Sequence, residues 1–270
     1  MRTDSFSLHG RVAVVTGGYG VIGGTIASAL ARAGASIVIV GRRADAAERK
    51  VGEIEAAGGA AFAEVGDVLD EAQMRGVRDR VVAARGQVDV LINAAGGNVA
   101  RARNDTRPIF EIPLDAFDEV LRLNLHGTLI PSLAFGEAMA HRGAGSIVNV
   151  SSMASTQALS GVMGYSVAKA GIDNFTKWLA VEMARKHGAV RVNAIAPGFF
   201  VSEQNRTVLL KPDGSYTDRA RAIVAKTPMG RFGNPEELVG AVQWLCSDAS
   251  AFVTGAVIPV DGGFSAFSGV

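Results

Sequence analysis

The stretch Val12-Ala13-Val14-Val15-Thr16-Gly17-Gly18-Tyr19-Gly20-Val21-Ile22-Gly23 decides the fold of this chain. An apolar run over residues 11–16 stops at glycines, which is typical of a buried parallel strand. A helical pattern follows over residues 26–33, and three glycines between the two have the spacing G-x-G-x-x-G. Glycines let a backbone approach a pyrophosphate, and a helix N-terminus offers it free N–H groups. The stretch therefore predicts a nucleotide-binding strand–turn–helix unit, with an ordinary tight turn as the alternative.

The next strand, residues 36–40, leads into Gly41-Arg42-Arg43. An NAD-type fold places Asp or Glu at this point to bind both ribose hydroxyls. Two guanidiniums without a carboxylate suit a 2′-phosphate better than a 2′-hydroxyl. The sequence therefore favours NADP(H) over NAD(H). The other interpretation is that the two arginines are a solvated lead-in to the following helix.

Strands and helices alternate through the rest of the chain. The pattern predicts further strands at 60–65, 88–93, 145–150, 190–196 and 256–260, and further helices at 44–57, 71–84, 114–140, 162–182 and 235–247. We expect a kink at Pro131, because proline cannot donate a backbone hydrogen bond. Residues 199–233 are long, polar and irregular, as a lid or substrate loop is.

This alternation predicts the fold class α/β, as a single doubly wound Rossmann-type domain over residues 1–270. Its parallel seven-stranded sheet is flanked by helices. We assign residues 10–150, in round numbers, to a nucleotide-binding half and residues 151–270 to a catalytic and substrate-loop half. Ligands of such folds bind at the carboxyl ends of the strands.

Composition excludes several kinds of partner. A hydrophobic content of 48% and a charged content of 20% describe a globular protein with a large core. A net charge of +1 gives no reason to expect nucleic acid or an anionic membrane as a partner. No apolar run approaches the roughly 20 residues that span a bilayer, and no apolar segment follows Arg2 as in a signal peptide. The sequence predicts a cytoplasmic protein, with Cys246 a buried small hydrophobe and the four scattered histidines no metal site.

Tyr165 and Lys169 are four residues apart within the predicted helix 162–182, so they share one face. A lysine beside a phenol stabilises the phenolate, and we expect the pKa of Tyr165 to be lowered from about 10. A tyrosine tuned in this way transfers a proton near neutral pH. An interfacial tyrosine with an exposed lysine is the alternative, because this spacing also arises by chance.

Two further polar residues have open assignments. Asp67 follows the third strand, where it either accepts a hydrogen bond from an adenine amino group or caps the next helix. Asn124 lies between leucines in the predicted helix 114–140. A buried amide needs partners, so Asn124 either ties that helix to a neighbour or lines a site.

Taken together, these residues resemble the short-chain dehydrogenase/reductase family over nearly the whole chain. Thr16-Gly17 through Ile22-Gly23 is similar to its glycine motif, with Val21 where the family usually has the middle glycine. Asn93-Ala94-Ala95-Gly96 resembles its sheet-stabilising Asn-Asn-Ala-Gly motif with the second Asn lost. Pro197-Gly198 matches the motif beside the nicotinamide, and Ser202 falls near the usual carboxamide-binding threonine.

The resemblance implies a catalytic tetrad of Asn124, Ser152, Tyr165 and Lys169. Tyr165 would transfer the hydroxyl proton, Ser152 would bond the same oxygen, Lys169 would bind the nicotinamide ribose, and Asn124 would hold a water. The implied cofactor site comprises Gly17, Gly18, Tyr19, Val21, Ile22, Gly23, Arg42, Arg43, Asp67, Val68, Asn93, Ala94, Ala95, Gly96, Tyr165, Lys169, Pro197, Gly198, Phe200 and Ser202.

The C-terminal third, with motifs such as Thr227-Pro228-Met229-Gly230-Arg231-Phe232, is similar to the D-mannonate oxidoreductase (fructuronate reductase) subgroup. This resemblance implies reversible reduction of D-fructuronate to D-mannonate. The alternatives are a dehydrogenase of another polyol or sugar acid, such as a gluconate 5-dehydrogenase, and a non-catalytic nucleotide-binding sensor on the same fold.

A sugar acid carries a fixed carboxylate, which a site recognises best through guanidinium. Two arginine-bearing segments, 98–107 and 204–206, are expected to border the Tyr165 pocket. Our substrate candidates are Arg101 and Arg206 for the carboxylate, with Asn98, Gln204 and Asn205 for hydroxyls. The alternative is that these loop arginines are simply solvated.

The expected partners are therefore a small-molecule substrate and further copies of this chain. The resemblance implies a homotetramer. In addition, Phe252, Phe264 and Phe267 predict an apolar C-terminal tail that a monomer would expose.

Overall fold

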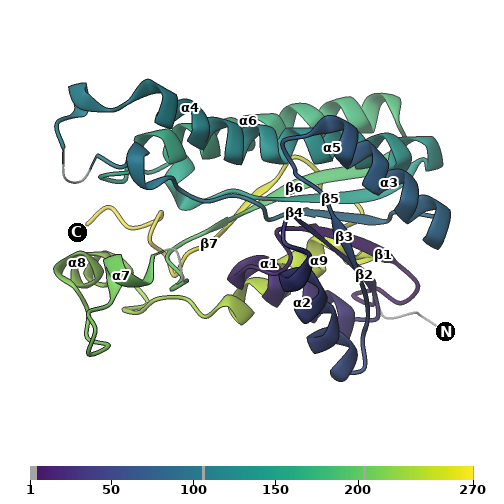
Figure 1. The fold of residues 1–270 in the computed structure, drawn as a ribbon, viewed down its shortest axis with the longest axis horizontal. Helices are drawn as coiled ribbons and strands as arrows, with labels where there is room; N and C mark the ends of the chain where they lie inside the picture. Colours follow the sequence, from purple (N-terminus) through teal and green to yellow (C-terminus); the bar gives the residue numbers. More distant parts are fainter. Residues whose placement is uncertain (1–4, 105–106, 203–204, 270) are drawn as a thin grey trace.

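The computed structural model describes residues 5–104, 107–202 and 205–269 (Figure 1). Seven strands form one sheet in the order β3-β2-β1-β4-β5-β6-β7, and every neighbouring pair is parallel. The strands are β1 (Val12–Thr16), β2 (Ser36–Gly41), β3 (Ala60–Val65), β4 (Val90–Asn93), β5 (Ala144–Val150), β6 (Ala189–Pro197) and β7 (Val257–Val260). The strand order reverses between β1 and β4, which opens a crevice at their carboxyl ends.

Helices cover both faces of the sheet (Figure 1). One face carries α1 (Val21–Arg32), α2 (Ala44–Ala56) and α9 (Val239–Cys246), and the other carries α3 (Glu71–Arg85), α4 (Leu114–Leu121), α5 (Gly127–Arg142) and α6 (Met163–Lys186). Alternate residues of β1 enter opposite apolar clusters, Val12 and Val14 on one side and Ala13 and Val15 on the other. This two-sided burial explains the unbroken apolar runs, and the predicted doubly wound fold is confirmed.

The predicted helix 114–140 is interrupted before its proline. A π-helical turn, η3 (Arg122–His126), separates α4 from α5, and Pro131 lies inside α5. From this turn, the side-chain amide of Asn124 donates to the Val120 carbonyl oxygen of α4 at 2.9 Å. A π-turn alters the regular backbone bonding, and such turns are frequent at functional sites. The regular α-helix is therefore interrupted around Asn124, ahead of Pro131, where the sequence predicts a kink.

The segment 199–233 is less irregular than its composition predicts. It contains α7 (Arg206–Leu209) and α8 (Asp218–Lys226), and Thr217 caps α8 by accepting from Ala220 N. Leu209 and two residues of α8 form a small apolar cluster. Figure 1 places α7 and α8 beyond the main body, at the end of the molecule where the chain also finishes.

The predicted apolar tail is only partly exposed. Phe264 is 4% exposed and packs edge-on against Phe199, and Phe267 is half-buried. Phe252 alone of the three predicted residues is fully exposed. Cys246, the last residue of α9, is buried in the apolar cluster that α1 and α9 form with the sheet. This burial raises the pKa of its thiol to about 12.

Within the described ranges, no helix has the length and apolar character needed to cross a membrane. The same residues contain no group of three or more His, Cys, Asp or Glu side chains suited to a metal ion.

Candidate active site

A groove of about 480 Å³ lies at the carboxyl ends of β1, β2 and β4. It brings together most of the cofactor residues that the sequence predicts, namely Gly17, Tyr19, Val21, Ile22, Gly23, Arg42, Arg43, Asp67, Val68, Ala94, Ala95, Gly96 and Ser202. Gly18 and Asn93 are buried beneath it rather than on its surface. Tyr165, Pro197, Gly198 and Phe200 line a second cavity, which Ser202 borders as well.

The glycines of this groove are required by close backbone contacts. Gly17 has a φ of +63°, and a Cβ there would lie 2.9 Å from the Ala95 backbone. A Cβ at Gly23 would lie 2.5 Å from the Gly17 carbonyl oxygen. The N-cap of α1, Gly20, offers no side-chain hydrogen bond, and the first turn holds no acidic residue. This uncapped helix start on a glycine cradle fits the pyrophosphate of a dinucleotide.

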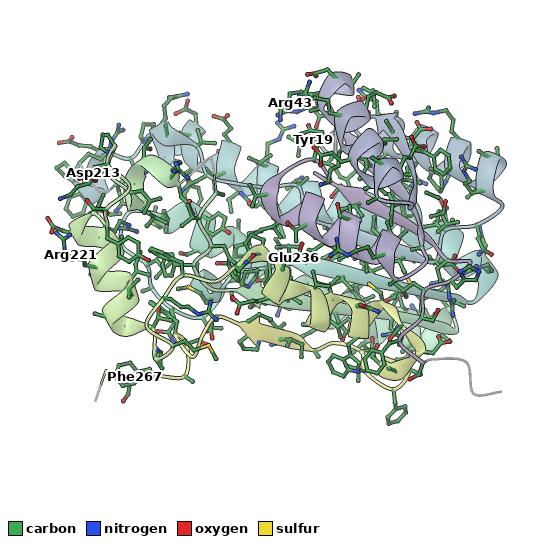
Figure 2. All side chains as sticks on the ribbon, turned by 90° about the horizontal axis from the view of Figure 1, so that it is seen from below. Tyr19, Arg43, Asp213, Arg221, Glu236 and Phe267 are labelled. Atoms are coloured by element: carbon green, nitrogen blue, oxygen red, sulfur yellow. The ribbon has the colours of Figure 1, made fainter. Side chains whose placement is uncertain are left out.

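The end of β2 is closed by an aromatic ring instead of a carboxylate. A Cβ at Gly41 would lie 2.2 Å from the Tyr19 ring, so an acidic side chain there would displace Tyr19. The Arg43 guanidinium lies 4.9 Å from the centroid of that ring (Figure 2). Arg42 and Arg43 are both exposed on the groove. This edge of the groove is therefore positively charged.

Asp67 lines the groove and does not cap the following helix. Asp70 is the N-cap of α3 and accepts from Gln73 N at 3.0 Å. Asp67 instead accepts from Leu69 N at 3.0 Å, which fixes the turn after β3. The capping interpretation of Asp67 is therefore wrong.

Asn93 is 1% exposed and joins a buried polar network below the groove. Its amide donates to Ser132 Oγ at 2.8 Å and to Asn149 Oδ1 at 2.9 Å. Asn149 in turn donates to Thr176 Oγ1 at 2.9 Å. The side chain of Asn93 therefore joins β4 to α5 and β5 and does not line the groove, so a cofactor contact of Asn93 would come from its backbone.

Tyr165 and Lys169 share one face of α6, as the i,i+4 spacing predicts. The Lys169 ammonium is buried, lies 5.4 Å from the Tyr165 ring centroid and donates to the Val150 carbonyl oxygen at 2.7 Å. Ser152 follows β5 and lies close enough to Tyr165 to lower the pKa of its phenol. The end of β5 therefore holds Tyr165 and Lys169 in place.

The predicted low pKa of Tyr165 is wrong for the protein without cofactor. Burial raises the pKa of Tyr165 above its usual value, and the hydrogen bond with Ser152 lowers it by less. Burial also lowers the pKa of Lys169 to about 8, although the Asp173 carboxylate opposes this shift. Lys169 donates its N–H to a backbone carbonyl oxygen, and near pH 8 it is only partly charged.

Asn124 ties η3 to the loop after β4. Its Oδ1 accepts from Gly97 N at 3.1 Å, and its Nδ2 donates to the Gly97 carbonyl oxygen at 2.7 Å. A Cβ at Gly96 would lie 2.7 Å from Asn124 Oδ1 and 3.7 Å from Lys169 Nζ. The sequence left two alternatives for Asn124, a tie between its helix and a neighbouring segment or a place on the wall of a site. The structure shows the tie, and this tie lies beside Lys169.

The second cavity, of about 470 Å³, contains the reactive side chains Ser152 and Tyr165. We call it the catalytic cavity. Ile22 and Ser202 line both this cavity and the nucleotide groove, so the two spaces meet. A cofactor in the groove would therefore end beside the phenol of Tyr165, which is the geometry that hydride transfer with proton transfer requires.

The predicted substrate residues are only partly brought to this cavity. Asn98 and Asn205 line it, but Asn205 accepts from Ser202 N and donates to the Phe200 carbonyl oxygen, both at 2.8 Å. Its amide is therefore committed to the loop and not to a substrate hydroxyl. Gln204 lies outside the described residues.

Neither predicted carboxylate-binding arginine lines the catalytic cavity. The Arg101 guanidinium pairs with Asp115 on the surface, which raises the pKa of Arg101, and Arg206 is exposed. Two other arginines, Arg103 and Arg219, line the cavity instead. Arg103 belongs to the predicted segment 98–107, and Arg219 lies in the predicted substrate loop 199–233, where the sequence did not single it out.

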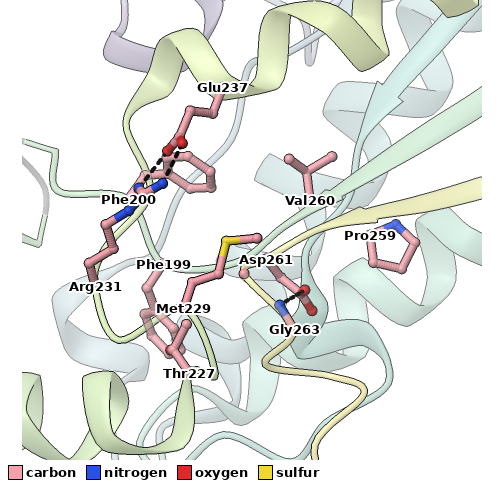
Figure 3. Close-up of a pocket in the computed structure, with 12 residues that line it drawn as sticks. Phe199, Phe200, Thr227, Met229, Arg231, Glu237, Pro259, Val260, Asp261 and Gly263 are labelled. Carbon is pink, nitrogen blue, oxygen red and sulfur yellow. Dashed lines mark hydrogen bonds and ion pairs between the residues drawn. The ribbon is translucent and has the colours of Figure 1, made fainter.

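A third cavity, of about 400 Å³, lies behind Phe199 and Phe200 (Figure 3). Its charged groups are satisfied internally: Arg231 donates to both Glu237 oxygens, at 2.7 and 2.6 Å, and Asp261 accepts from Gly263 N at 2.9 Å. The Arg231 guanidinium holds the pKa of Glu237 at about 2. This third cavity is lined by none of the predicted catalytic residues Ser152, Tyr165 and Lys169.

Comparison with known proteins agrees with this geometry. A family model described as enoyl-(acyl carrier protein) reductase matches residues 19–265. The chain belongs to the short-chain dehydrogenase/reductase family and is an NAD(P)-dependent oxidoreductase.

Among similar proteins, the oxidoreductase UxuB of Bacillus subtilis (strain 168) is 42% identical over 98% of both chains. A Haemophilus influenzae structure with bound NAD, provisionally named a D-mannonate oxidoreductase, is 40% identical with a TM-score of 0.92, over 98% of both chains. A Beutenbergia cavernae structure, provisionally named an NAD(P)-dependent gluconate 5-dehydrogenase, holds NADP at low occupancy. It is 40% identical with a TM-score of 0.87, over 97% of this chain and all of its own.

Proposed function

We propose that this enzyme interconverts D-fructuronate and D-mannonate with a nicotinamide cofactor. The observation that carries the proposal is the junction of the two cavities, where Ile22 and Ser202 line both the groove and the cavity that holds Tyr165 and Ser152. Polar and charged side chains on the catalytic cavity, among them Asn98, Arg103 and Arg219, suit a polyhydroxylated anion. The relative provisionally named a D-mannonate oxidoreductase supports the same substrate.

In the proposed reaction, the bound nicotinamide supplies or accepts the hydride. Tyr165 donates its phenolic proton to the carbonyl oxygen during reduction, and Ser152 hydrogen-bonds the same oxygen as charge develops on it. Lys169 is placed to stabilise the phenolate that remains, because it is buried beside Tyr165. We also propose that Asn124, fixed next to Lys169 Nζ, holds a water that links Lys169 to solvent. Through this water Tyr165 regains its proton.

We propose that NADP(H) is preferred over NAD(H). The end of β2 carries Arg42 and Arg43, and the Tyr19 ring occupies the space that a ribose-binding carboxylate would need. Arg43 stacks on that ring, which leaves Arg42 as the side chain for the 2′-phosphate. NAD and NADP are each bound by one of the similar structures, so both cofactors suit this architecture.

Oxidation of gluconate at carbon 5 is the second candidate. The Beutenbergia cavernae structure supports it, because it is as identical to this chain as the Haemophilus influenzae one. Both candidates place a carboxylate and several hydroxyls in the same cavity, so they differ in stereochemistry and not in the class of substrate.

We further propose that the cytoplasmic enzyme is a homotetramer. Apolar side chains lie exposed on two neighbouring helices, Leu133 on α5 and Val167, Trp178 and Val181 on α6. The three α6 residues fall on one side of the helix, and Trp178 is 62% exposed. Exposed apolar side chains of this size on neighbouring helices are candidates for contact with a second copy. Sedimentation of a monomer at micromolar protein would contradict the proposal.

The substrate proposal is tested by steady-state reduction of D-fructuronate and of D-fructose, each with NADPH and with NADH. We expect kcat/KM for D-fructuronate to exceed that for D-fructose by at least about a hundredfold, because a site built for a charged group rejects an analogue without it. Oxidation of D-mannonate and of D-gluconate then separates the two candidates. Equal or better activity on D-fructose would remove the sugar-acid assignment.

A further inference from the structure

Arg219 is the second residue of α8, a different helix from α6, which carries Tyr165 and Lys169. It is half-buried and lines the same cavity as Tyr165 and Ser152. Its guanidinium donates from Nη1 to Ser160 Oγ at 3.2 Å and from Nη2 to the Ser160 carbonyl oxygen at 3.0 Å. These bonds hold α8 against the segment that leads into α6, so Arg219 bridges two walls of the cavity.

Both acceptors of Arg219 are neutral. Among the residues that the structure describes, no carboxylate forms an ion pair with Arg219. Several other arginines do have such a partner: Arg101 pairs with Asp115, Arg221 with Asp218 and Arg231 with Glu237. A guanidinium has five N–H donors, and Ser160 takes two of them. A partly buried cation without a counter-charge, facing a cavity, favours an anionic ligand.

The surroundings of Arg219 strengthen and orient such an interaction. Leu159, Val162, Phe199 and Leu209 supply apolar parts of the cavity wall, which reduce screening of a charge pair. The base of the side chain is rigid, because Thr217 caps α8 and also donates to the Val208 carbonyl oxygen at 2.8 Å. The donors therefore have a fixed position relative to the wall that holds Tyr165.

We propose that Arg219 binds the carboxylate of the sugar-acid substrate and so selects acids over neutral ketoses. This inference rests on the proposed function and gives to Arg219 the role that the sequence assigned to Arg101 and Arg206. Ser160 is a positioning residue in this arrangement, because it sets the plane of the guanidinium before the substrate arrives. The acid then enters between α8 and α6, with its carbonyl carbon at Tyr165.

The test compares Arg219→Ala and Arg219→Lys with the matched variant Arg221→Ala. Figure 2 shows Arg221 on the outer side of the same segment, where it donates to the Tyr216 carbonyl oxygen and pairs with Asp218. In Arg219→Ala we expect KM for D-fructuronate to rise at least about thirtyfold, with kcat changed much less, because truncation of a charged, hydrogen-bonded partner has effects of this size. Activity on D-fructose should stay within about twofold, and Arg219→Lys should recover part of the loss.

Ser160→Ala should raise the same KM by a smaller factor without affecting NADPH binding, whereas Arg221→Ala should leave both substrates unchanged. Melting temperature and NADPH affinity of each variant establish that it is folded. The inference is overturned if folded Arg219→Ala keeps the wild-type preference for the acid, or if it loses acid and neutral activity equally. A wild-type enzyme without acid preference would instead overturn the proposed function itself.

Discussion

The nucleotide groove and the catalytic cavity meet at Ser202, yet they are built in different ways. The groove is made largely from backbone at strand ends, where Gly17 and Gly23 permit contacts that any side chain would block. The catalytic cavity is closed by the segment 199–233, where side chains such as Arg219 decide what fits. The shape of the nucleotide groove is therefore determined by steric limits within short stretches of sequence. The shape of the catalytic cavity depends on how a long segment packs. The nucleotide groove should therefore not tolerate added atoms, whereas substitutions in the catalytic cavity should change substrate specificity without loss of folding.

The largest effect on cofactor affinity is expected from an added methyl group in the groove. Gly23→Ala would place a Cβ 2.5 Å from the Gly17 carbonyl oxygen, which forces the phosphate-binding turn to move. We expect NADPH affinity, measured by fluorescence titration, to fall at least about a hundredfold. Gly52→Ala in α2 is the matched control, since nothing lies within 4 Å of its added Cβ. It should bind NADPH normally and be slightly more stable, because alanine favours helix. Normal NADPH binding by Gly23→Ala would show that backbone contacts do not determine the groove.

A smaller, selective effect is expected at the charged edge of the groove. Arg42→Ala should weaken NADPH about tenfold and NADH hardly at all, because only NADPH carries the 2′-phosphate. Arg49→Ala removes an arginine of α2 that pairs with Asp45 and does not line the groove, so it should alter neither affinity. A wild-type preference for NADH, or equal losses for both cofactors in Arg42→Ala, would contradict the assignment.

The smallest effect is a change of proton affinity inside the catalytic cavity. Burial disfavours the charged phenolate, so Tyr165 of the cofactor-free protein should stay protonated until the pH exceeds about 10. Ultraviolet titration of the wild type minus Tyr165→Phe should therefore show no tyrosinate near neutral pH. Addition of NADP⁺ should bring that titration to lower pH, because a positive charge beside the phenol favours phenolate. A tyrosinate already present near neutral pH without cofactor would support the lowered pKa that the i,i+4 spacing predicts.

The same contrast explains how much could be predicted from sequence. Strand–glycine–helix patterns and the Tyr165–Lys169 spacing follow from local geometry. They correctly predicted the fold, the groove at the strand ends and the shared helix face of Tyr165 and Lys169. Asn93 and Asn124 were harder to assign, because the partners that bind their amides come from distant segments. Arg101 and Arg206 were chosen for charge and position in the chain, but a long segment can direct any of its arginines outward. Only the packing of α8 shows that Arg219 faces the cavity.

The central claim is that a carbonyl group is reduced where the groove and the cavity meet, with Tyr165 as the proton donor. Single-turnover oxidation of bound NADPH by D-fructuronate tests it most directly, in the wild type and in Tyr165→Phe. The account predicts unchanged NADPH affinity and a hydride-transfer rate reduced about a thousandfold or more in the variant, because one positioned acid is lost. A variant that binds NADPH normally and oxidises it at the wild-type rate would contradict the account.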